Sequence, residues 1–231
     1  MTNPLKKTCL ITGAGGYIGQ HLTNRLAEEN WDITGTINSS NHISTEQIHY
    51  LNIDLSNIDK IDLLLPELKK KRFDAIIHCA GYSPDLNILK ITEIDLLKAL
   101  NINYNALVRL NHLLENNINP HGQIIHFGSR VATQGNHGQI AYSVAKGLLI
   151  DYTKQLAAHL GNIPIKVNMI IPGVHPSKML GEYAKTVKEN AKKNSYLNQL
   201  TSIEDVLNCV LFLLQSKTIS GQIFNIESRP S

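Results

Sequence analysis

The chain has 231 residues, of which 42% are hydrophobic and 18% charged, a balance that excludes a disordered protein. Its 22 Lys and Arg against 19 Asp and Glu leave a net charge of only +3, and no basic patch is interleaved with aromatic residues, so no nucleic-acid partner is indicated. The length fits one domain over residues 1–231, and no apolar run reaches the roughly 20 residues that span a membrane.

The three cysteines, Cys9, Cys79 and Cys209, are odd in number and far apart. This pattern predicts neither a disulfide framework nor a zinc site. The N-terminus passes from two lysines through a short apolar run into glycines and does not resemble a signal peptide. We therefore expect a cytoplasmic protein with no membrane partner.

Strand patterns alternate with helical patterns along the chain, which predicts an α/β fold: a doubly wound parallel sheet of the Rossmann type with helices in three layers. The predicted strands are residues 7–12, 32–37, 48–53, 75–79, 123–127, 166–170 and 222–226. The predicted helices are residues 18–29, 58–71, 93–115, 142–160 and 201–214, the last with Ser202 and Asp205 at its start. Residues 173–200 show weak hydrophobic periodicity, and we expect this segment to cover the substrate.

A glycine-rich turn follows the first predicted strand and opens the first helix. There, glycines let backbone N–H groups approach a pyrophosphate at a helix N-terminus, although glycines also close ordinary strand–helix turns. The turn predicts dinucleotide binding by Thr12, Gly13, Gly15, Gly16, Tyr17, Ile18 and Gly19.

The ends of the second and third strands bear on which dinucleotide binds. A carboxylate after the second strand would favour NAD(H), whereas this chain has Asn38 and Ser39 there. NADP(H) is therefore the preferred cofactor, and NAD(H) stays an alternative because no arginine stands there either. Asp54, followed by Leu55, either contacts the adenine amino group or caps the next helix.

Tyr142 and Lys146 are four residues apart and so share one face of a predicted helix. Ser129 ends the preceding strand, and Asn103 lies in the long helix before that strand. In this order and spacing the chain resembles the short-chain dehydrogenase/reductase family, whose active site is an Asn-Ser-Tyr-Lys tetrad. The resemblance runs from residue 7 to residue 226.

The resemblance implies that a carbonyl and a secondary alcohol are interconverted by hydride transfer. Tyr142 would act as general acid and base, and Lys146 would lower the pKa of Tyr142 and hold the nicotinamide ribose. Ser129 would polarise the substrate oxygen. Asn103 would bend its helix and hold a water that connects Lys146 to solvent.

Further cofactor contacts follow from the same resemblance. The stretch from Pro172 to Ser177 resembles the family's support for the nicotinamide carboxamide. The residues implied are Ala80, Gly81, Pro172, Gly173, Val174 and Ser177. We expect His175 to be a loop histidine and His78 and His126 to be hydrogen-bonded core histidines, so no metal is predicted.

Two features point to different branches of the family. The spacing of Gly13, Gly16 and Gly19 is similar to the longer nucleotide-sugar epimerases and dehydratases, whereas residues 141–147 and the end of the chain match the single-domain branch with its 3-oxoacyl carrier protein reductases. We predict a single-domain oxidoreductase for a small carbonyl or alcohol substrate, with a 3-oxoacyl thioester as one candidate. The alternatives are an epimerase or dehydratase with tightly bound nicotinamide, and a non-catalytic NADP-sensing protein.

The family resemblance also implies a homodimer or homotetramer. Its interface would use the helices of residues 93–115 and 142–160. Leu148, Leu149, Tyr152 and Leu156 are the candidate contacts on the second helix. In the alternative, all four side chains face the sheet.

Overall fold

The computed structural model describes residues 6–38, 42–86 and 88–230. These residues form a seven-stranded sheet in the order β3-β2-β1-β4-β5-β6-β7, and each neighbouring pair is parallel. The predicted doubly wound parallel sheet is therefore confirmed. The strands are β1 Thr8–Thr12, β2 Asp32–Ile37, β3 Ile48–Asn52, β4 Phe73–His78, β5 Ile118–Phe127, β6 Lys166–Ile171 and β7 Ile223–Asn225.

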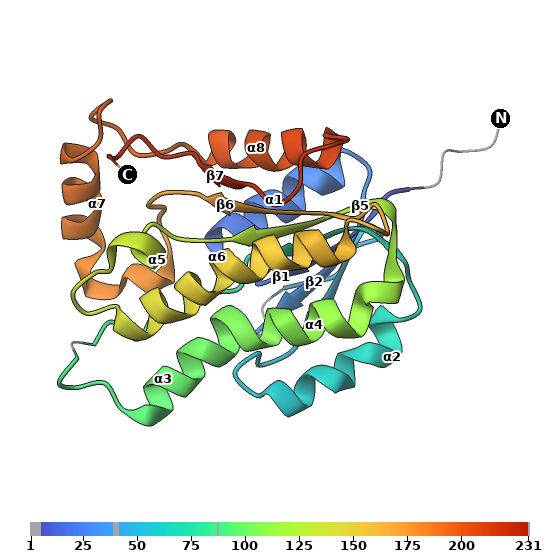
Figure 1. Cartoon of the computed structure of the whole chain (residues 1–231), viewed down its shortest axis with the longest axis horizontal. Coiled ribbons are helices and arrows are strands. Elements are labelled where there is room, and N and C mark those ends of the chain that lie inside the picture. The colour runs from blue at the N-terminus through green and yellow to red at the C-terminus, as the bar shows by residue number, and fades with distance from the viewer. Residues whose placement is uncertain (1–5, 39–41, 87, 231) are drawn as a thin grey trace.

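Helices cover both faces of the sheet, with α1 and α8 on one face and α2, α4 and α6 on the other (Figure 1). The α-helices are α1 Tyr17–Glu28, α2 Leu65–Leu68, α3 Glu93–Leu100, α4 Ala106–Leu114, α5 Val131–Gln134, α6 Ile140–Leu160, α7 Ala184–Lys193 and α8 Ile203–Gln215. The 3₁₀ helices are Ile58–Leu64, Glu115–Asn117 and Lys178–Tyr183. In the part of the chain that the structure describes, no helix has the length and apolarity to cross a membrane.

Each face of the sheet has its own hydrophobic core. On one face, Leu22 and Leu26 of α1 pack with Val206 and Val210 of α8 against the strands. The other face is filled by side chains from the helices beneath it, among them Ile61, Leu64, Leu110, Leu114 and Leu160. Burial of one such side chain contributes about 1.5–3 kcal/mol, so the two cores hold the strand ends in a fixed frame.

The chain reverses its direction of travel across the sheet between β1 and β4. From β1 it moves outward to β2 and β3, and it then returns to place β4 on the other side of β1. Parallel strands end at one edge, and the reversal leaves a crevice there because the loops after β1 and β4 turn away from each other. The loops that carry the predicted site residues therefore meet at this crevice.

Two predicted helices are interrupted. Residues 58–71 form a 3₁₀ helix followed by the short α2, whose first turn contains Pro66, a residue with no N–H for a continuous helical ladder. The helix predicted for 93–115 is divided by the π-helix Asn101–Asn105. There the Asn103 side chain donates its Nδ2 to the carbonyl of Ala99 at 2.8 Å, and this competes with the regular backbone bond.

Strand β5 begins five residues earlier than the predicted segment 123–127. Pro120, His121 with φ 66° and Gly122 have the character of a turn, which hid the first half of the strand. The pairing of β4 with β5 shifts register between Phe73 and Ala75, which accommodates this irregular stretch.

Residues 173–200 contain the helix α7, which the sequence did not predict. The helix is highly polar, and Ala191 is its one buried residue among those whose burial the structure describes. Its end is held by polar bonds, since the Tyr196 N–H donates to the Ser228 carbonyl at 2.9 Å and the hydroxyls of Ser195 and Ser228 contact each other. Hydrogen bonds to the C-terminal segment anchor this stretch where apolar side chains are few.

Candidate active site

A cavity of about 1350 Å³ opens at the carboxyl ends of the strands. Ligand pockets usually measure about 300–1,000 Å³, so this one has room for a dinucleotide together with a substrate. The predicted residues that line it are Gly13, Gly15, Gly16, Tyr17, Ile18, Gly19, Asn38, Asp54, Leu55, Ala80, Gly81, Ser129, Tyr142, Lys146, Pro172, Gly173, Val174 and Ser177. Thr12 and Asn103 lie behind the wall, and Ser39 lies outside the described residues.

The glycine turn packs directly against the end of β4. Gly13 has φ +69°, and a Cβ atom on it would lie 2.6 Å from the Ala80 Cα, so a side chain has no room there. Thr12 supports this contact from behind because its hydroxyl accepts from the Ala80 N–H at 3.5 Å. The turn therefore leaves bare backbone facing the cavity at the start of α1, which fits the pyrophosphate of a dinucleotide.

At the far end of the cavity, Asp54 is not the cap of the following helix. Its Oδ1 accepts from the Ser56 N–H at 2.9 Å, and the cap is Asn57, which accepts from the Lys60 N–H at 3.3 Å. The capping interpretation of Asp54 is therefore wrong. The hydrogen bonds from Ser56 lower the pKa of Asp54, so a carboxylate lines the cavity at this end.

His42 borders the glycine turn, and the sequence analysis did not single it out. A Cβ atom on Gly15 would lie 2.6 Å from the His42 Nε2, so the imidazole borders the glycine turn. The ring of His42 lies 5.1 Å from that of Tyr50 on β3, measured between ring centres. The only available signal was its place in the loop after β2, where a ribose or its phosphate is read.

Tyr142 and Lys146 lie in the first half of α6 and line the cavity together with Ser129. The Lys146 Nζ donates to the Phe127 carbonyl at 2.7 Å and lies 5.7 Å from the centre of the Tyr142 ring. The three residues that the sequence singled out therefore line the same cavity.

The ionisation of the pair differs from the expectation. Burial raises the pKa of Tyr142 to about 12, although the Ser129 hydroxyl acts to lower it. Burial also lowers the pKa of Lys146 to about 8. Desolvation of the phenol outweighs the opposing interactions in this structure, and the lowering of the Tyr142 pKa by Lys146 stays a prediction.

Asn103 is fully buried, and its carboxamide binds the loop after β4. Its Oδ1 accepts from the Tyr82 N–H at 3.2 Å, and its Nδ2 donates to the Tyr82 carbonyl at 2.7 Å and to the Ala99 carbonyl. The predicted bend in the helix is confirmed by the π-turn at this residue. The same bonds fix the position of Gly81 on the cavity wall.

The three histidines that the sequence analysis discussed, His78, His126 and His175, all form hydrogen bonds. His78 Nε2 pairs with the Asn111 Oδ1 at 2.9 Å, and Asn111 Nδ2 lies 3.3 Å from His126 Nε2. Burial lowers the pKa of His78 to about 4 and that of His126 well below its usual value, so both are neutral. His175 bonds the Pro172 carbonyl at 2.8 Å, as expected of a loop histidine. Within the described residues, no three His, Cys, Asp or Glu side chains gather as a metal site.

Several residues between 177 and 191 line the cavity, among them Ser177, Met179 and Leu180. Met179 reaches across it, since a Cβ atom on Gly81 would lie 3.1 Å from the Met179 Cε. Val187 and Lys188 of α7 complete this wall. The segment therefore contributes part of the cavity wall.

Known proteins of similar sequence and structure match almost the whole chain. The family model described as Enoyl-(Acyl carrier protein) reductase matches residues 13–228. The 3-oxoacyl-[acyl-carrier-protein] reductase FabG of Aquifex aeolicus is 28% identical over 236 residues, covering 95% of each chain. Carbonyl reductase family member 4 of Xenopus laevis is 26% identical, covering 96% of this chain and 97% of the relative. The structure of 4-hydroxyisoleucine dehydrogenase with NADH has a TM-score of 0.88 and 26% identity, covering 97% of this chain and 98% of that one.

The chain belongs to the short-chain dehydrogenase/reductase family. It is an NAD(P)-dependent oxidoreductase that acts on CH–OH and C=O groups of small molecules.

Proposed function

We propose that this enzyme reduces a small ketone to a secondary alcohol, with Tyr142 as the general acid. The observation that carries the proposal is the convergence of Ser129, Tyr142 and Lys146 on one wall of a cavity whose other end is the glycine turn. 3-Oxoacyl thioesters are the first candidate substrates, because the similarity to FabG of Aquifex aeolicus spans 95% of both chains.

The residues divide the chemistry among them. Bound nicotinamide supplies the hydride for the carbonyl carbon. The Ser129 hydroxyl donates a hydrogen bond to the carbonyl oxygen, and Tyr142 gives its proton to that oxygen as negative charge develops. With a pKa of about 12 the phenol is protonated at neutral pH, so it has the proton that the carbonyl oxygen receives in reduction. Lys146 and the backbone of Gly13 and Gly16 would hold the ribose and pyrophosphate.

NADP(H) is the proposed cofactor. Asn38 rather than a carboxylate lines the cavity where β2 ends, so the 2′-phosphate meets no like charge there. The neighbouring His42 imidazole adds a hydrogen-bonding group beside Gly15. The related 4-hydroxyisoleucine dehydrogenase holds NADH, so both dinucleotides belong in every assay.

The test is reduced-dinucleotide oxidation by wild type and by Tyr142→Phe with a ketone, a quinone, a 3-oxoacyl thioester and an enoyl thioester. Loss of a general acid costs about 10²–10⁴ in rate, so we expect kcat to fall at least about a hundredfold with unchanged cofactor affinity. Wild-type turnover in Tyr142→Phe would refute the role of the phenol. Activity on the enoyl thioester alone would show that the enzyme reduces a C=C bond instead of a ketone. Tightly bound nicotinamide without net turnover would favour an epimerase or dehydratase.

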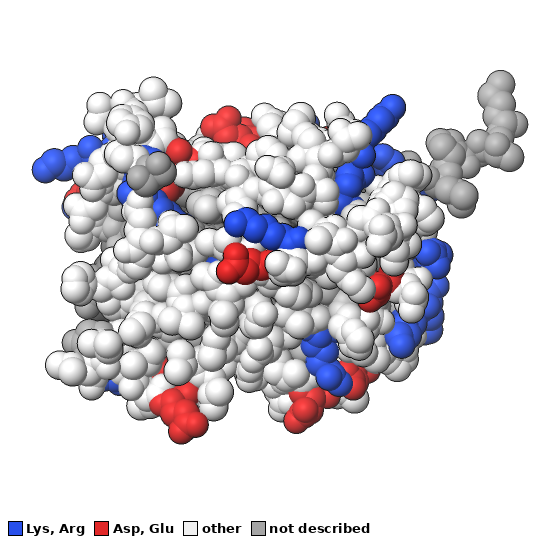
Figure 2. Space-filling view, viewed as in Figure 1, with Lys and Arg blue, Asp and Glu red and all other residues white. Residues whose placement is uncertain are grey.

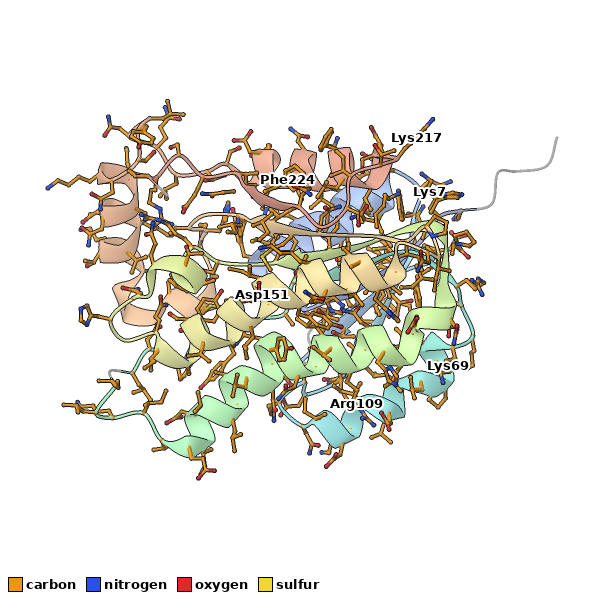
Figure 3. All side chains as sticks on the ribbon, in the orientation of Figure 1. Lys7, Lys69, Arg109, Asp151, Lys217 and Phe224 are labelled. Atoms are coloured by element: carbon orange, nitrogen blue, oxygen red, sulfur yellow. The ribbon has the colours of Figure 1, made fainter. Side chains whose placement is uncertain are left out.

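We also propose that the enzyme assembles through α3 and α6. The alternative that all four candidate side chains face the sheet is wrong, because Leu148 is 46% exposed while Leu149 is fully buried. Leu97 and Val144 are exposed as well. Uncharged residues cover most of this face (Figure 2), and Asp151 of α6 lies on it (Figure 3). Such a face supports a dimer contact.

A further inference from the structure

Two arginines share one buried carboxylate at the C-terminal end of the chain. The Arg229 Nε donates to the Glu227 Oε2 at 2.7 Å, and its Nη2 contacts the same oxygen. The Arg130 Nε lies 3.8 Å from the Glu227 Oε1. The Glu227 side chain is only 4% exposed, whereas those of Arg130 and Arg229 are 24% and 18% exposed, and the three groups together carry a net charge of +1.

The cluster presents its cations to the substrate side of the cavity. Arg130 directly follows Ser129, and both arginines line the cavity, whereas Glu227 lines a small separate pocket behind them. The Nη2 of Arg130 donates to the Pro230 carbonyl at 2.7 Å, which holds the guanidinium in place. Figure 1 shows the C-terminal end beside α5 and α7, at the open end of the sheet.

The hydrogen bonds of the cluster are incomplete. At 3.8 Å the Arg130 Nε and the Glu227 Oε1 are too far apart to bond, and both atoms are buried without a partner among the described residues. In the same part of the chain, no hydrogen bond uses the Nη1 nitrogen of either arginine. The Nη1 nitrogens are not among the buried atoms without a partner, so they are open to a ligand, and an anion in the cavity could accept hydrogen bonds from them.

The charges on the surrounding cavity wall also favour an anionic ligand. Lys188 of α7 is a further cation on it, and Asp54, beyond β3, is the one carboxylate among the lining residues that the structure describes. An excess of one positive charge in the cluster matches a monoanion, and the planar guanidinium fork matches a carboxylate.

We propose that Arg130 and Arg229 bind the carboxylate of an oxo-acid substrate, with Glu227 as the residue that positions both arginines. The inference rests on the proposed ketone reduction and favours free oxo acids over the 3-oxoacyl thioesters, whose carboxyl group is bonded to sulfur and carries no charge. Arg130, Arg229 and Ser129 line the same cavity, so one substrate can present its carbonyl to Ser129 and its carboxylate to the arginines.

The kinetic test compares 3-oxobutanoate with methyl 3-oxobutanoate, which share the reacting carbonyl and differ by one negative charge. We expect wild type to prefer the acid by at least about tenfold in kcat/KM. Arg130→Gln should lower kcat/KM for the acid about 10- to 100-fold, mainly through KM, and should lower kcat/KM for the uncharged ester much less. Arg130→Lys keeps the positive charge but loses the paired N–H donors of the guanidinium, so its kcat/KM for the acid should lie between those of wild type and Arg130→Gln. Hydroxyacetone phosphate, a ketone that carries a phosphate in place of the carboxylate, tests whether the site prefers a phosphate.

A matched control removes an arginine that is ion-paired away from the cavity. Arg109 bonds Asp62 on the outer surface (Figure 3), and Arg109→Gln should behave as wild type with every substrate. An equal loss on acid and ester in Arg130→Gln, or a preference for hydroxyacetone phosphate over the acid, would overturn the carboxylate site.

A binding measurement separates this site from the reaction itself. Calorimetric titration of the NADPH complex with butanoate and with butanamide needs no turnover. Arg130→Gln should raise the Kd of butanoate at least tenfold and leave that of butanamide unchanged. Butanoate binding that depends on Arg130, without reduction of any ketone, would keep the anion site and refute the proposed function. Ketone reduction without tighter binding of butanoate than of butanamide would keep the proposed function and refute the anion site.

Discussion

Replacement of Gly13 by alanine tests whether the glycine turn is as closely packed as its geometry requires. Alanine at φ +69° costs about 1–2 kcal/mol because its Cβ meets its own backbone. The new Cβ would also lie 2.6 Å from the Ala80 Cα and 2.7 Å from the Ala80 N, and backbone atoms there have to move. Overpacking of this kind costs about a further 1–3 kcal/mol. We therefore expect Gly13→Ala to lose about 2–5 kcal/mol of unfolding free energy.

Gly138 supplies the matched control. Its φ is +83°, and a Cβ on it would meet nothing within 4 Å, so Gly138→Ala carries only the cost of the backbone angle. For a chain of this length each kcal/mol shifts Tm by about 2–4 °C, which predicts a loss of about 4–20 °C for Gly13→Ala and about 2–8 °C for Gly138→Ala.

Urea unfolding and NADPH titration of both variants measure the two effects. The displaced turn in Gly13→Ala should weaken NADPH binding at least about tenfold, and Gly138→Ala should leave it unchanged. Equal stability losses in the two variants would show that the contact with Ala80 contributes nothing, and intact NADPH affinity in Gly13→Ala would remove the turn from the cofactor site.

Three further predictions follow from charge and exposure. The pKa of Lys146 is about 8 in the folded protein, and an unfolded lysine titrates near 10.4, so the unfolded chain binds more protons between these pH values. The free energy of unfolding should therefore rise about 2 kcal/mol more from pH 7 to 9.5 in wild type than in Lys146→Met. Equal shifts of the urea midpoint in the two proteins would contradict this. Asn38→Asp should weaken NADPH but not NADH, and a wild type that binds NADH ten times more tightly would reverse the cofactor assignment. Light scattering should find wild type dimeric or tetrameric and Val144→Asp with Leu148→Asp monomeric, and a monomeric wild type would reject the interface.

Local patterns in the sequence were sufficient for the frame and for much of the site. The strand patterns and the spacing indicated that Ser129, Tyr142 and Lys146 come together, since Ser129 follows a strand and the other two share a helix face, and in the structure all three line one cavity. The start of α8 was equally readable, since the Ser202 hydroxyl accepts from the Asp205 N–H at 3.0 Å. Such signals depend on neighbours a few residues apart, so a single sequence contains them.

The tertiary structure alone decided how buried each group is and which distant groups meet. The raised pKa of Tyr142 reflects desolvation by segments far away in the chain, which no local pattern reports. Helix α7 was missed because bonds to Ser228 rather than an apolar stripe hold its end. Arg130 and Arg229 were unremarkable in the sequence, and they become a candidate anion site only where the fold brings both to Glu227 at the cavity wall.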